Sequence, residues 1–177
     1  MLKCLNGEGH LYGLDVDPIE IVKTESRLRK LGYDESILTV CPVNFADIDK
    51  VSEKYGKFDF ILADLGVSSM QIDNPERGFS YKADGPLDLR LNPNKGVSAA
   101  ERLKEITKDE FEGMLVENSD EPYAAEIARA VFSKMKKGGR IETTSDLRQI
   151  IEDTLEFVPK AERKEAVKKS CMRVFQA

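Results

Sequence analysis

Two acidic side chains follow predicted β-strands directly, and both are candidates for chemistry. Asp15 closes the short apolar stretch 10–15, and Asp64 comes after the apolar run 58–63. In an open α/β sheet, ligands bind at the carboxyl ends of the strands, where these carboxylates would stand. Asp15 could accept hydrogen bonds from both ribose hydroxyls of an adenosine-containing cofactor. From the residues alone, an acid that merely turns the chain after a strand is an equally good interpretation of Asp15.

An aromatic residue, Phe45, follows the predicted strand 36–41 and is a third candidate. Its ring could cover the adenine face of the same cofactor, although a Phe packed in the core is the commoner outcome. By itself, Asp15 fits an NAD-dependent dehydrogenase as well as a methyltransferase. Nothing after the run 58–63 resembles a hydride-transfer site, so the dehydrogenase is the weaker hypothesis.

A long polar loop follows Asp64. Residues 65–91 are rich in Gly, Ser, Asp, Pro and Arg, whereas connections in compact domains usually span about 4–6 residues. Loops of this length often carry binding residues. An ordinary solvated loop is the alternative, and we favour a binding loop because of its length and composition.

The elements that would position these residues alternate between strand and helix. A helix is predicted from Asp17, a good N-cap residue followed by Pro18 at the first helical position, to a stop at Gly32. A second helix is predicted over 46–55. The order strand, helix, strand, helix, strand predicts α/β architecture, a partial Rossmann-like doubly wound parallel sheet.

The pattern changes in the second half of the chain, where successive helix starts replace this alternation. Two capping boxes are predicted, in each of which a Ser or Thr precedes a Glu by three residues. They begin at Ser98 and Thr107. Helices are predicted at 98–105, 108–117, 121–137, 144–156 and 160–173. We therefore expect two domains, a partial α/β domain at 1–97 and an all-helical domain at 98–177.

The charge balance argues against one class of protein. The chain of 177 residues has a formal net charge of −5, which is unlike a protein that binds nucleic acid over its whole surface. A local basic face is compatible with this balance, and the stretch 160–173 is strongly basic. A solvated helix face is the commoner explanation of such a stretch.

Cysteine and histidine usage predicts neither a disulfide framework nor a metal site. Cys4, Cys41 and Cys171 are scattered and form no CxxC pair, which is typical of a reduced, cytoplasmic compartment. The single histidine, His10, stands beside a predicted strand and is best explained as structural. No apolar run approaches the roughly 20 residues that a membrane helix needs, so no membrane association is expected.

The long loop and its flanks carry motifs that occur in order along nearly the whole chain. They are DLGVSS (64–69), QID (71–73), ERGFS (76–80) and DGPLDLR (84–90), with GLDVDP (13–18) and NF (44–45) before them and SAAE (98–101), TT (143–144) and RVFQA (173–177) after them. In this order they resemble the MraW family, the ribosomal RNA small subunit methyltransferases H. The central block is too long and too unusual to match this family by chance.

The resemblance implies an activity, a cofactor and a set of contacts. The activity would be N4-methylation of a cytosine in 16S ribosomal RNA of the small ribosomal subunit, with S-adenosyl-L-methionine as the methyl donor. Asp15, Phe45, Asp64 and Gln71 would contact the cofactor, and the helical domain would be inserted into the methyltransferase sheet. No catalytic residue is assigned, although Asp64 stands where other amino-methylating enzymes hold an acid or amide against the target amine.

Four residues of the long loop are candidates for contacts with the RNA. They are Arg77, Phe79, Tyr81 and Arg90. The basic stretch 160–173 is a further candidate, and packing within the loop explains the four residues equally well.

The chain departs from the family pattern in two segments. Residues 119–121 (SDE) stand where a Gly-Glu-Glu segment is expected, and residues 169–172 (KSCM) replace a His-Pro-Ala-Thr-like segment. The family also has a strand and a glycine-rich turn before the matching region, so we expect an internal fragment with little activity of its own. The alternative function is a non-catalytic module that binds RNA or protein through its helices.

Overall fold

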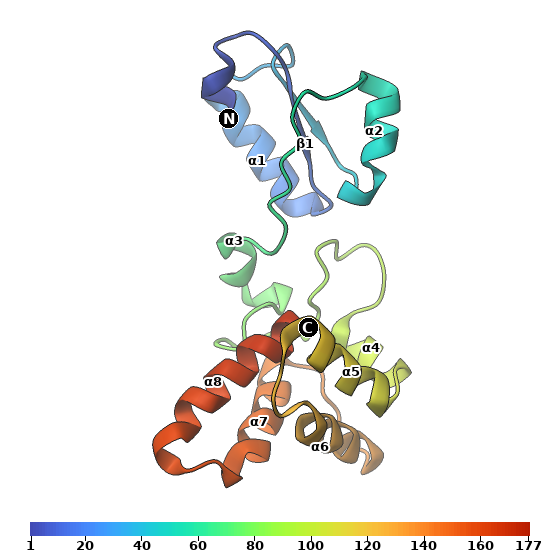
Figure 1. The fold of residues 1–177 in the computed structure, drawn as a ribbon, viewed down its shortest axis with the longest axis vertical. Coiled ribbons are helices and arrows are strands. Elements are labelled where there is room, and N and C mark those ends of the chain that lie inside the picture. The colour runs from blue at the N-terminus through green and yellow to red at the C-terminus, as the bar shows by residue number, and fades with distance from the viewer. The chain divides into compact units, whose positions relative to one another are not determined.

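The computed structural model describes all residues from 1 to 177 (Figure 1). They form two compact units, each of which has its own interior. The N-terminal unit comprises Met1–Leu65 with Leu91–Asn94, and the helical unit comprises Gly66–Arg90 with Lys95–Ala177.

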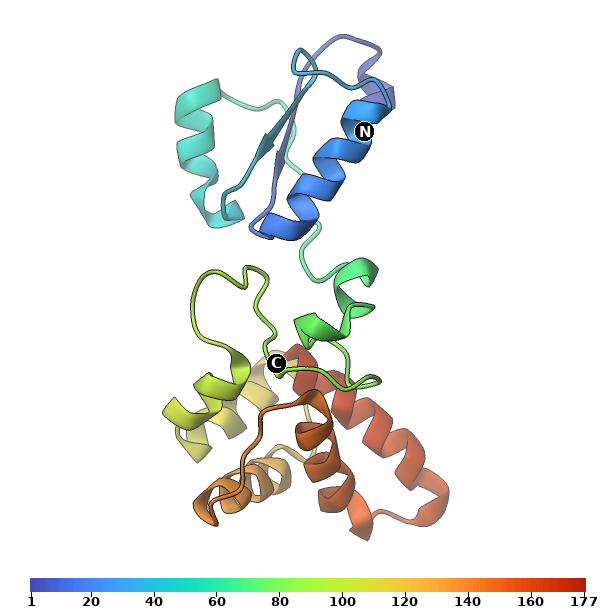
Figure 2. The same ribbon diagram turned by 180° about the vertical axis from the view of Figure 1, so that it is seen from behind.

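The N-terminal unit is a small parallel sheet flanked by two helices (Figure 2). In chain order its elements are η1 (Leu2–Leu5), β1 (Leu11–Leu14), α1 (Pro18–Lys30), β2 (Leu38–Cys41), η2 (Phe45–Asp47) and α2 (Ile48–Tyr55). The strands pair in parallel from Leu11 opposite Leu38 to Leu14 opposite Cys41. The predicted parallel pairing of the first two strands is therefore confirmed, with α1 as the crossover between them.

Helix α1 begins as its sequence predicts. The Asp17 carboxylate accepts hydrogen bonds from the backbone N–H groups of Ile19 and Glu20, at 2.9 and 3.2 Å. These bonds satisfy two of the donors that the first turn of a helix leaves free. Pro18 occupies the first helical position, where its missing N–H costs nothing.

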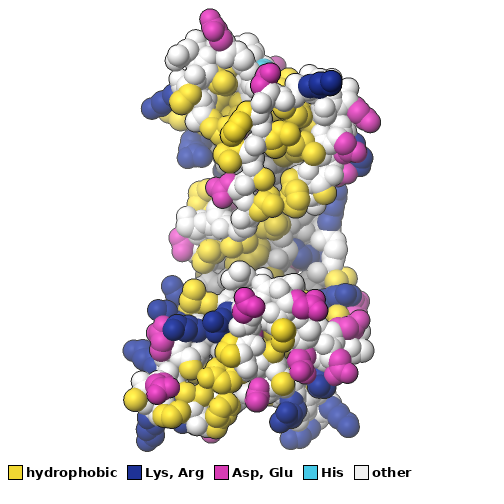
Figure 3. All heavy atoms as spheres, in the orientation of Figure 1, with side chains coloured by type: hydrophobic (Ala, Val, Ile, Leu, Met, Phe, Trp, Pro, Cys, Tyr) yellow, Lys and Arg dark blue, Asp and Glu magenta, His cyan; other side chains and the backbone are white.

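The predicted third strand is wrong. Residues 58–63 run without β-structure, and the sheet contains only β1 and β2. The side chains of Phe60, Ile61 and Leu62 are 61–71% exposed, and hydrophobic side chains show on the surface of this unit in Figure 3. An apolar run becomes a strand only where a neighbouring strand supplies backbone hydrogen bonds, and no residue of this run pairs with β1 or β2. The sheet of this unit therefore consists of two parallel strands.

The helical unit contains eight helical elements, and its only β-pairing is an isolated bridge between Pro86 and Thr143. In chain order they are α3 (Ser69–Ile72), η3 (Pro75–Arg77), α4 (Ala99–Glu105), α5 (Lys108–Ser119), α6 (Ala124–Lys136), α7 (Thr144–Thr154), η4 (Leu155–Phe157) and α8 (Lys160–Gln176). Both predicted capping boxes, at Ser98 and Thr107, are confirmed. The centre of the core is formed by fully buried side chains that include Leu115, Ile127 and Ile151.

Residues 66–90, which we call the signature loop, belong to the fold of the helical unit. Leu87 lies in the helical core and is 1% exposed. Its N–H donates to the carbonyl of Glu142 at 2.8 Å, and its own carbonyl accepts from the N–H of Ala100. The domain limits predicted at residues 97 and 98 stay a prediction.

Thr144, at the start of α7, fastens the signature loop to the helices. Its buried hydroxyl donates to the carbonyl of Ala83 at 2.8 Å and accepts from the N–H of Gly85 at 3.1 Å. Its backbone N–H donates to the carbonyl of Gly85 at 2.9 Å. One residue therefore forms three hydrogen bonds with the backbone of the loop.

Position 85, beside this junction, has room only for glycine. A Cβ atom at Gly85 would lie 2.1 Å from the carbonyl oxygen of Pro75, which is backbone and cannot swing away. The backbone at Gly85 therefore packs directly against the backbone at Pro75, which only glycine allows.

We expect Thr144→Val to destabilise the protein by about 1–3 kcal/mol, because the change keeps the side-chain shape but leaves the Ala83 carbonyl and the Gly85 N–H short of a partner. Urea unfolding followed by circular dichroism measures the loss. Thr154→Val is the matched control, since the Thr154 hydroxyl donates only to Ile150 within its own helix. Equal effects of the two substitutions would contradict the fastening role of Thr144.

A pair of glycine substitutions tests the close approach at position 85. Gly85→Ala is expected to destabilise by about 1–3 kcal/mol or more through overpacking. Gly113→Ala, inside α5 with no atom within 4 Å of the added Cβ, should instead stabilise by about 0.5–1 kcal/mol. Thermal unfolding measures both variants. Shifts of the two melting temperatures in the same direction would contradict the packing argument.

Candidate functional site

Asp15 lies directly beyond the end of β1 and is exposed. Its backbone N–H donates to the carbonyl of Cys41 at 3.2 Å, which extends the pairing of β1 with β2 by one step. Its Oδ1 accepts from the N–H of Asp17 at 2.9 Å, and the structure shows no partner for Oδ2. One carboxylate oxygen therefore fixes the turn into α1, while the other is available to a ligand.

Phe45 is not a core residue. It begins η2 and its side chain is 58% exposed. The Asn44 side chain fixes this turn by accepting from the N–H of Ala46 at 2.9 Å. An exposed aromatic ring on a fixed turn is a surface on which a planar group can stack.

Asp15 and Phe45 follow the carboxyl ends of two paired strands. Because β1 and β2 are parallel and in register from Leu11 to Leu14, both turns leave the sheet at the same edge. This is the edge at which ligands bind in open α/β sheets. The sheet edge of the N-terminal unit thus presents a carboxylate oxygen and an aromatic ring.

Asp64 and Gln71 have different surroundings from these two. Asp64 is exposed in the unpaired stretch at the end of the N-terminal unit, whereas Gln71 is buried in the helical unit. The convergence of all four residues on one cofactor stays a prediction.

Gln71 forms a capping box that the sequence analysis missed. Its Oε1 accepts from the N–H of Ser68 at 2.7 Å, and the Ser68 hydroxyl accepts from the N–H of Gln71 at 3.3 Å. The signal is present in the sequence as a Ser three residues before a Gln. Gln71 therefore shapes the start of the signature loop.

Packing accounts for the two arginines considered as RNA contacts. Arg77 is buried, donates to the carbonyl of Arg90 at 3.1 Å and lies over the ring of Phe79. Arg90 binds the Asp88 carboxylate with two nitrogens, at 2.8 and 2.6 Å. This hydrogen-bonded ion pair holds the pKa of the Asp88 carboxyl below its usual value.

Tyr81 is also explained by packing. Its ring meets the ring of Phe175 edge to face, with the centroids 5.9 Å apart, and the side chain packs against the helical core. The contact joins the signature loop to the C-terminal helix α8.

The two segments that depart from the family pattern meet in the interior. The Ser170 hydroxyl of α8 donates to Oε1 of Glu121 at 2.8 Å, and both side chains are buried. The same oxygen accepts from the N–H of Tyr123 at 3.0 Å. The two segments therefore meet in one contact, between Glu121 and Ser170, across 49 residues of sequence.

Two of the three cysteines are buried, and the pKa values of their thiols are raised. Burial raises the pKa of the Cys171 thiol to about 11, so it stays protonated at neutral pH. Cys41 is buried too, and burial likewise raises its pKa. Among the 177 residues no group of three or more His, Cys, Asp and Glu side chains could hold a metal ion, and no helix has both the length and the apolar character to cross a membrane.

Comparison with known proteins identifies relatives of the whole chain. The MraW methylase family matches residues 1–177. The chain is 62% identical to ribosomal RNA small subunit methyltransferase H 1 of Lachnoclostridium phytofermentans, over all of this chain and 48% of that protein. It is 60% identical to ribosomal RNA small subunit methyltransferase H 1 of Agathobacter rectalis, over all of this chain and 51% of that protein.

A more distant relative extends the comparison. The chain is 35% identical to ribosomal RNA small subunit methyltransferase H of Acinetobacter baumannii over 153 residues, which is 85% of this chain and 47% of that protein. The chain thus spans about half the length of the curated relatives that it matches.

The ion pair of the signature loop predicts a dependence of stability on pH. Since the folded pKa of Asp88 is lowered, its stabilising contribution is present above the unfolded pKa of about 3.9 and is lost as the pH falls through the folded pKa. We expect Asp88→Asn to be less stable than the parent at neutral pH, with the difference vanishing in acid.

Urea unfolding at a series of pH values measures this difference. Glu117→Gln, which changes an exposed carboxylate of α5 without an ion pair, serves as the control and should stay close to the parent throughout. A gap between Asp88→Asn and the parent that is the same at about pH 3 and at about pH 7 would contradict the assignment.

Proposed function

This chain belongs to the MraW methylase family, and from that premise we propose that it serves S-adenosyl-L-methionine-dependent N4-methylation of a cytosine in 16S ribosomal RNA. The observation that carries the proposal is the 62% identity, along the whole chain, to a protein named as a ribosomal RNA small subunit methyltransferase. The partner is the small ribosomal subunit, and this substrate places the activity in the cytoplasm.

The residues at the sheet edge fit an adenosine-containing methyl donor. When bound, S-adenosyl-L-methionine supplies an electrophilic methyl group on sulfur. The Oδ2 atom of Asp15 can accept from a ribose hydroxyl, because Oδ1 alone holds the turn. The exposed ring of Phe45 can stack on the adenine. Their common edge of the sheet supports this assignment.

Asp64 and Gln71 complete the proposed set of contacts. Asp64 is exposed, so its carboxylate is accessible to a ligand. Gln71 already uses Oε1 to hold the N–H of Ser68, so its contribution includes fixing the turn through which the signature loop begins.

The proposed reaction asks for positioning more than for a reactive side chain. The exocyclic amine of cytosine is a poor nucleophile because its lone pair is delocalised into the ring. An acceptor that takes a hydrogen bond from this amine, together with in-line alignment to the methyl group, supplies most of the help. The buried, protonated thiol of Cys171 is not needed for this chemistry, and we assign no catalytic residue.

We further propose that the helical part of the chain, predicted at 98–177, is an inserted domain that receives the RNA, while 1–97 contributes to the methyltransferase domain. The helical character of 98–177 supports the proposal.

A chimera tests the function with the residues of this chain. In it, the chain replaces the matching segment of the Lachnoclostridium phytofermentans relative, to which it is 62% identical. The assay measures transfer of a tritiated methyl group to small subunits that lack the modification. We expect transfer to cytosine N4; no transfer by a folded chimera with Asp64 intact would favour the non-catalytic binding module.

Within this chimera, Asp15→Asn is expected to weaken S-adenosyl-L-methionine binding by about 10–100-fold, since a hydrogen bond to a charged group contributes about 1.5–3 kcal/mol. Isothermal titration calorimetry measures the affinity. Asp49→Asn, at an exposed acid of α2 in the same unit, is the matched control and should bind like the parent. Unchanged affinity in the Asp15 variant would remove Asp15 from the proposed site.

A further inference from the structure

The end of α6 carries an unusual density of positive charge for an acidic protein. Four cations occur within seven residues, in a chain whose formal net charge is −5. They are Lys134, Lys136, Lys137 and Arg140. The first three form no ion pair, and Arg140 approaches Glu142 only at 3.8 Å. In Figure 3 the basic side chains of the helical unit likewise gather in groups.

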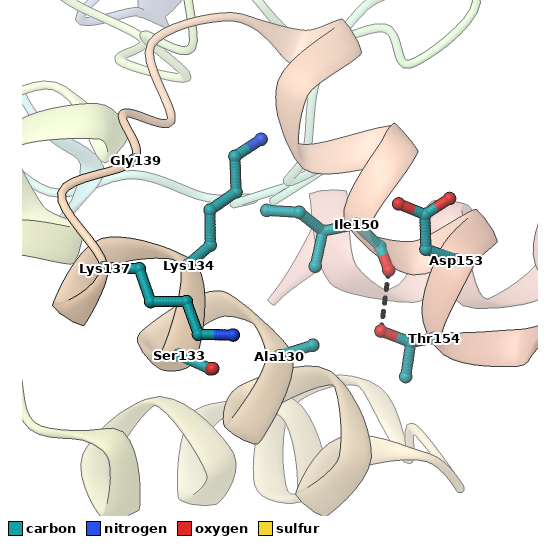
Figure 4. A pocket seen from close by; sticks show the side chains of 8 residues that line it. All are labelled: Ala130, Ser133, Lys134, Lys137, Gly139, Ile150, Asp153 and Thr154. Atoms are coloured by element: carbon teal, nitrogen blue, oxygen red, sulfur yellow. Dashed lines mark hydrogen bonds between the residues drawn. The ribbon is translucent and has the colours of Figure 1, made fainter.

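Two of these lysines line an open hollow between α6 and α7. Its volume is about 420 Å³, and it lies entirely within the helical unit. Figure 4 shows Lys134 and Lys137 on the α6 side, with Asp153 and Thr154 on the α7 side and Ile150 between them. None of the four predicted cofactor residues lines this hollow.

The side chains, and not the backbone, are available to a ligand on the α6 side. The N–H groups of Lys137, Gly138 and Gly139 already donate to carbonyls of the last helical turn. A ligand there would meet the ammonium groups of Lys134 and Lys137 and the hydroxyl of Ser133. This set of donors suits the oxygens of a phosphodiester.

The α7 wall of the hollow carries a negative charge instead, at Asp153. Asp153 is fixed by the side-chain amide of Gln149, which donates to its Oδ1 at 2.8 Å. Its Oδ2 has no partner in the structure, and no lysine of the hollow pairs with it. A carboxylate repels phosphate but accepts a hydrogen bond from a hydroxyl, and the 2′-hydroxyl is the group that distinguishes RNA from DNA.

We propose that this hollow binds one sugar–phosphate unit of RNA, with the phosphate against Lys134 and Lys137 and the ribose 2′-hydroxyl against Asp153. The proposal rests on the proposed ribosomal RNA substrate, and it adds an RNA contact outside the cofactor site. Lysines near the C-terminus of a helix also offset its dipole, but that role requires neither a hollow nor a carboxylate on the facing helix.

Fluorescence anisotropy of the full 177-residue chain tests the proposal. The probes are a labelled single-stranded RNA of about 12 nucleotides and the DNA of the same sequence. The variant Lys134→Ala/Lys137→Ala is expected to bind RNA about fivefold more weakly than the parent chain does at about 0.1 M salt. The slope of log affinity against log salt concentration should fall by about 0.7, because the variant neutralises one phosphate fewer than the parent.

Two variants control for charge and for folding. Lys95→Ala/Lys104→Ala removes the same charge from exposed positions of the helical unit outside the hollow and should bind like the parent. Lys134→Arg/Lys137→Arg keeps both charges and should retain most of the affinity. Thermal unfolding of each variant shows that the helical unit is intact.

Asp153→Ala separates ribose recognition from charge. We expect RNA binding to weaken about tenfold, because the variant has no charged acceptor for the ribose hydroxyl. DNA binding should instead strengthen, because a carboxylate that repels phosphate is gone. A parallel change for RNA and DNA would overturn the ribose contact.

The remaining outcomes are equally decisive. No RNA binding by the parent chain at about 50 mM salt, or equal losses in the Lys134/Lys137 and Lys95/Lys104 variants, would overturn the proposal. Failure of methyl transfer in the chimera would remove the proposed enzymatic function, yet it would leave these binding differences in place. The two failures are therefore distinguishable.

Discussion

The burial of Leu87 among the helices is the interaction on which the arrangement of the signature loop depends. This side chain reaches the core from a segment that is otherwise loop, and the hydrogen bonds of Thr144 close over the same segment. A loop of this length would lose much conformational entropy on ordering, and burial of a leucine offsets only part of that cost. The junction at Thr144 and the close approach at Gly85 are the further restraints that keep the loop in one conformation.

In the N-terminal unit the corresponding constraint is the parallel register of β1 and β2. Parallel strands place their carboxyl ends at one edge, and the turns that follow are fixed by the side chains of Asp15 and Asn44. Short polar side chains bonded to nearby N–H groups hold such turns without any help from distant residues. The geometry of this edge is therefore set by the strand register together with these local contacts.

What the sequence predicts well is what local chemistry decides. Asp17 and Pro18 mark the start of α1, and the Ser98 and Thr107 boxes mark α4 and α5, because a helix cap needs only residues within one turn. The strand predicted at 58–63 is wrong because strand formation requires a neighbour that periodicity does not reveal. The roles of Thr144 and Leu87 are hidden for the same reason, since Thr144 bonds to Gly85 and the N–H of Leu87 to Glu142, each more than 50 residues away. The capping box at Gln71 is local and could have been found.

Membership in the family and stability of the fold are linked through the signature loop. Arg77, Gly85 and Leu87, which carry much of the resemblance, all serve the packing of the helical unit. Selection that maintained only a folded, RNA-binding scaffold would preserve these three residues as faithfully as selection for catalysis. In lineages where a second copy of such a gene drifts away from its enzymatic role, the motif would outlast the activity. The earliest trace of that divergence would then be sought at exposed positions such as Asp15 and Phe45.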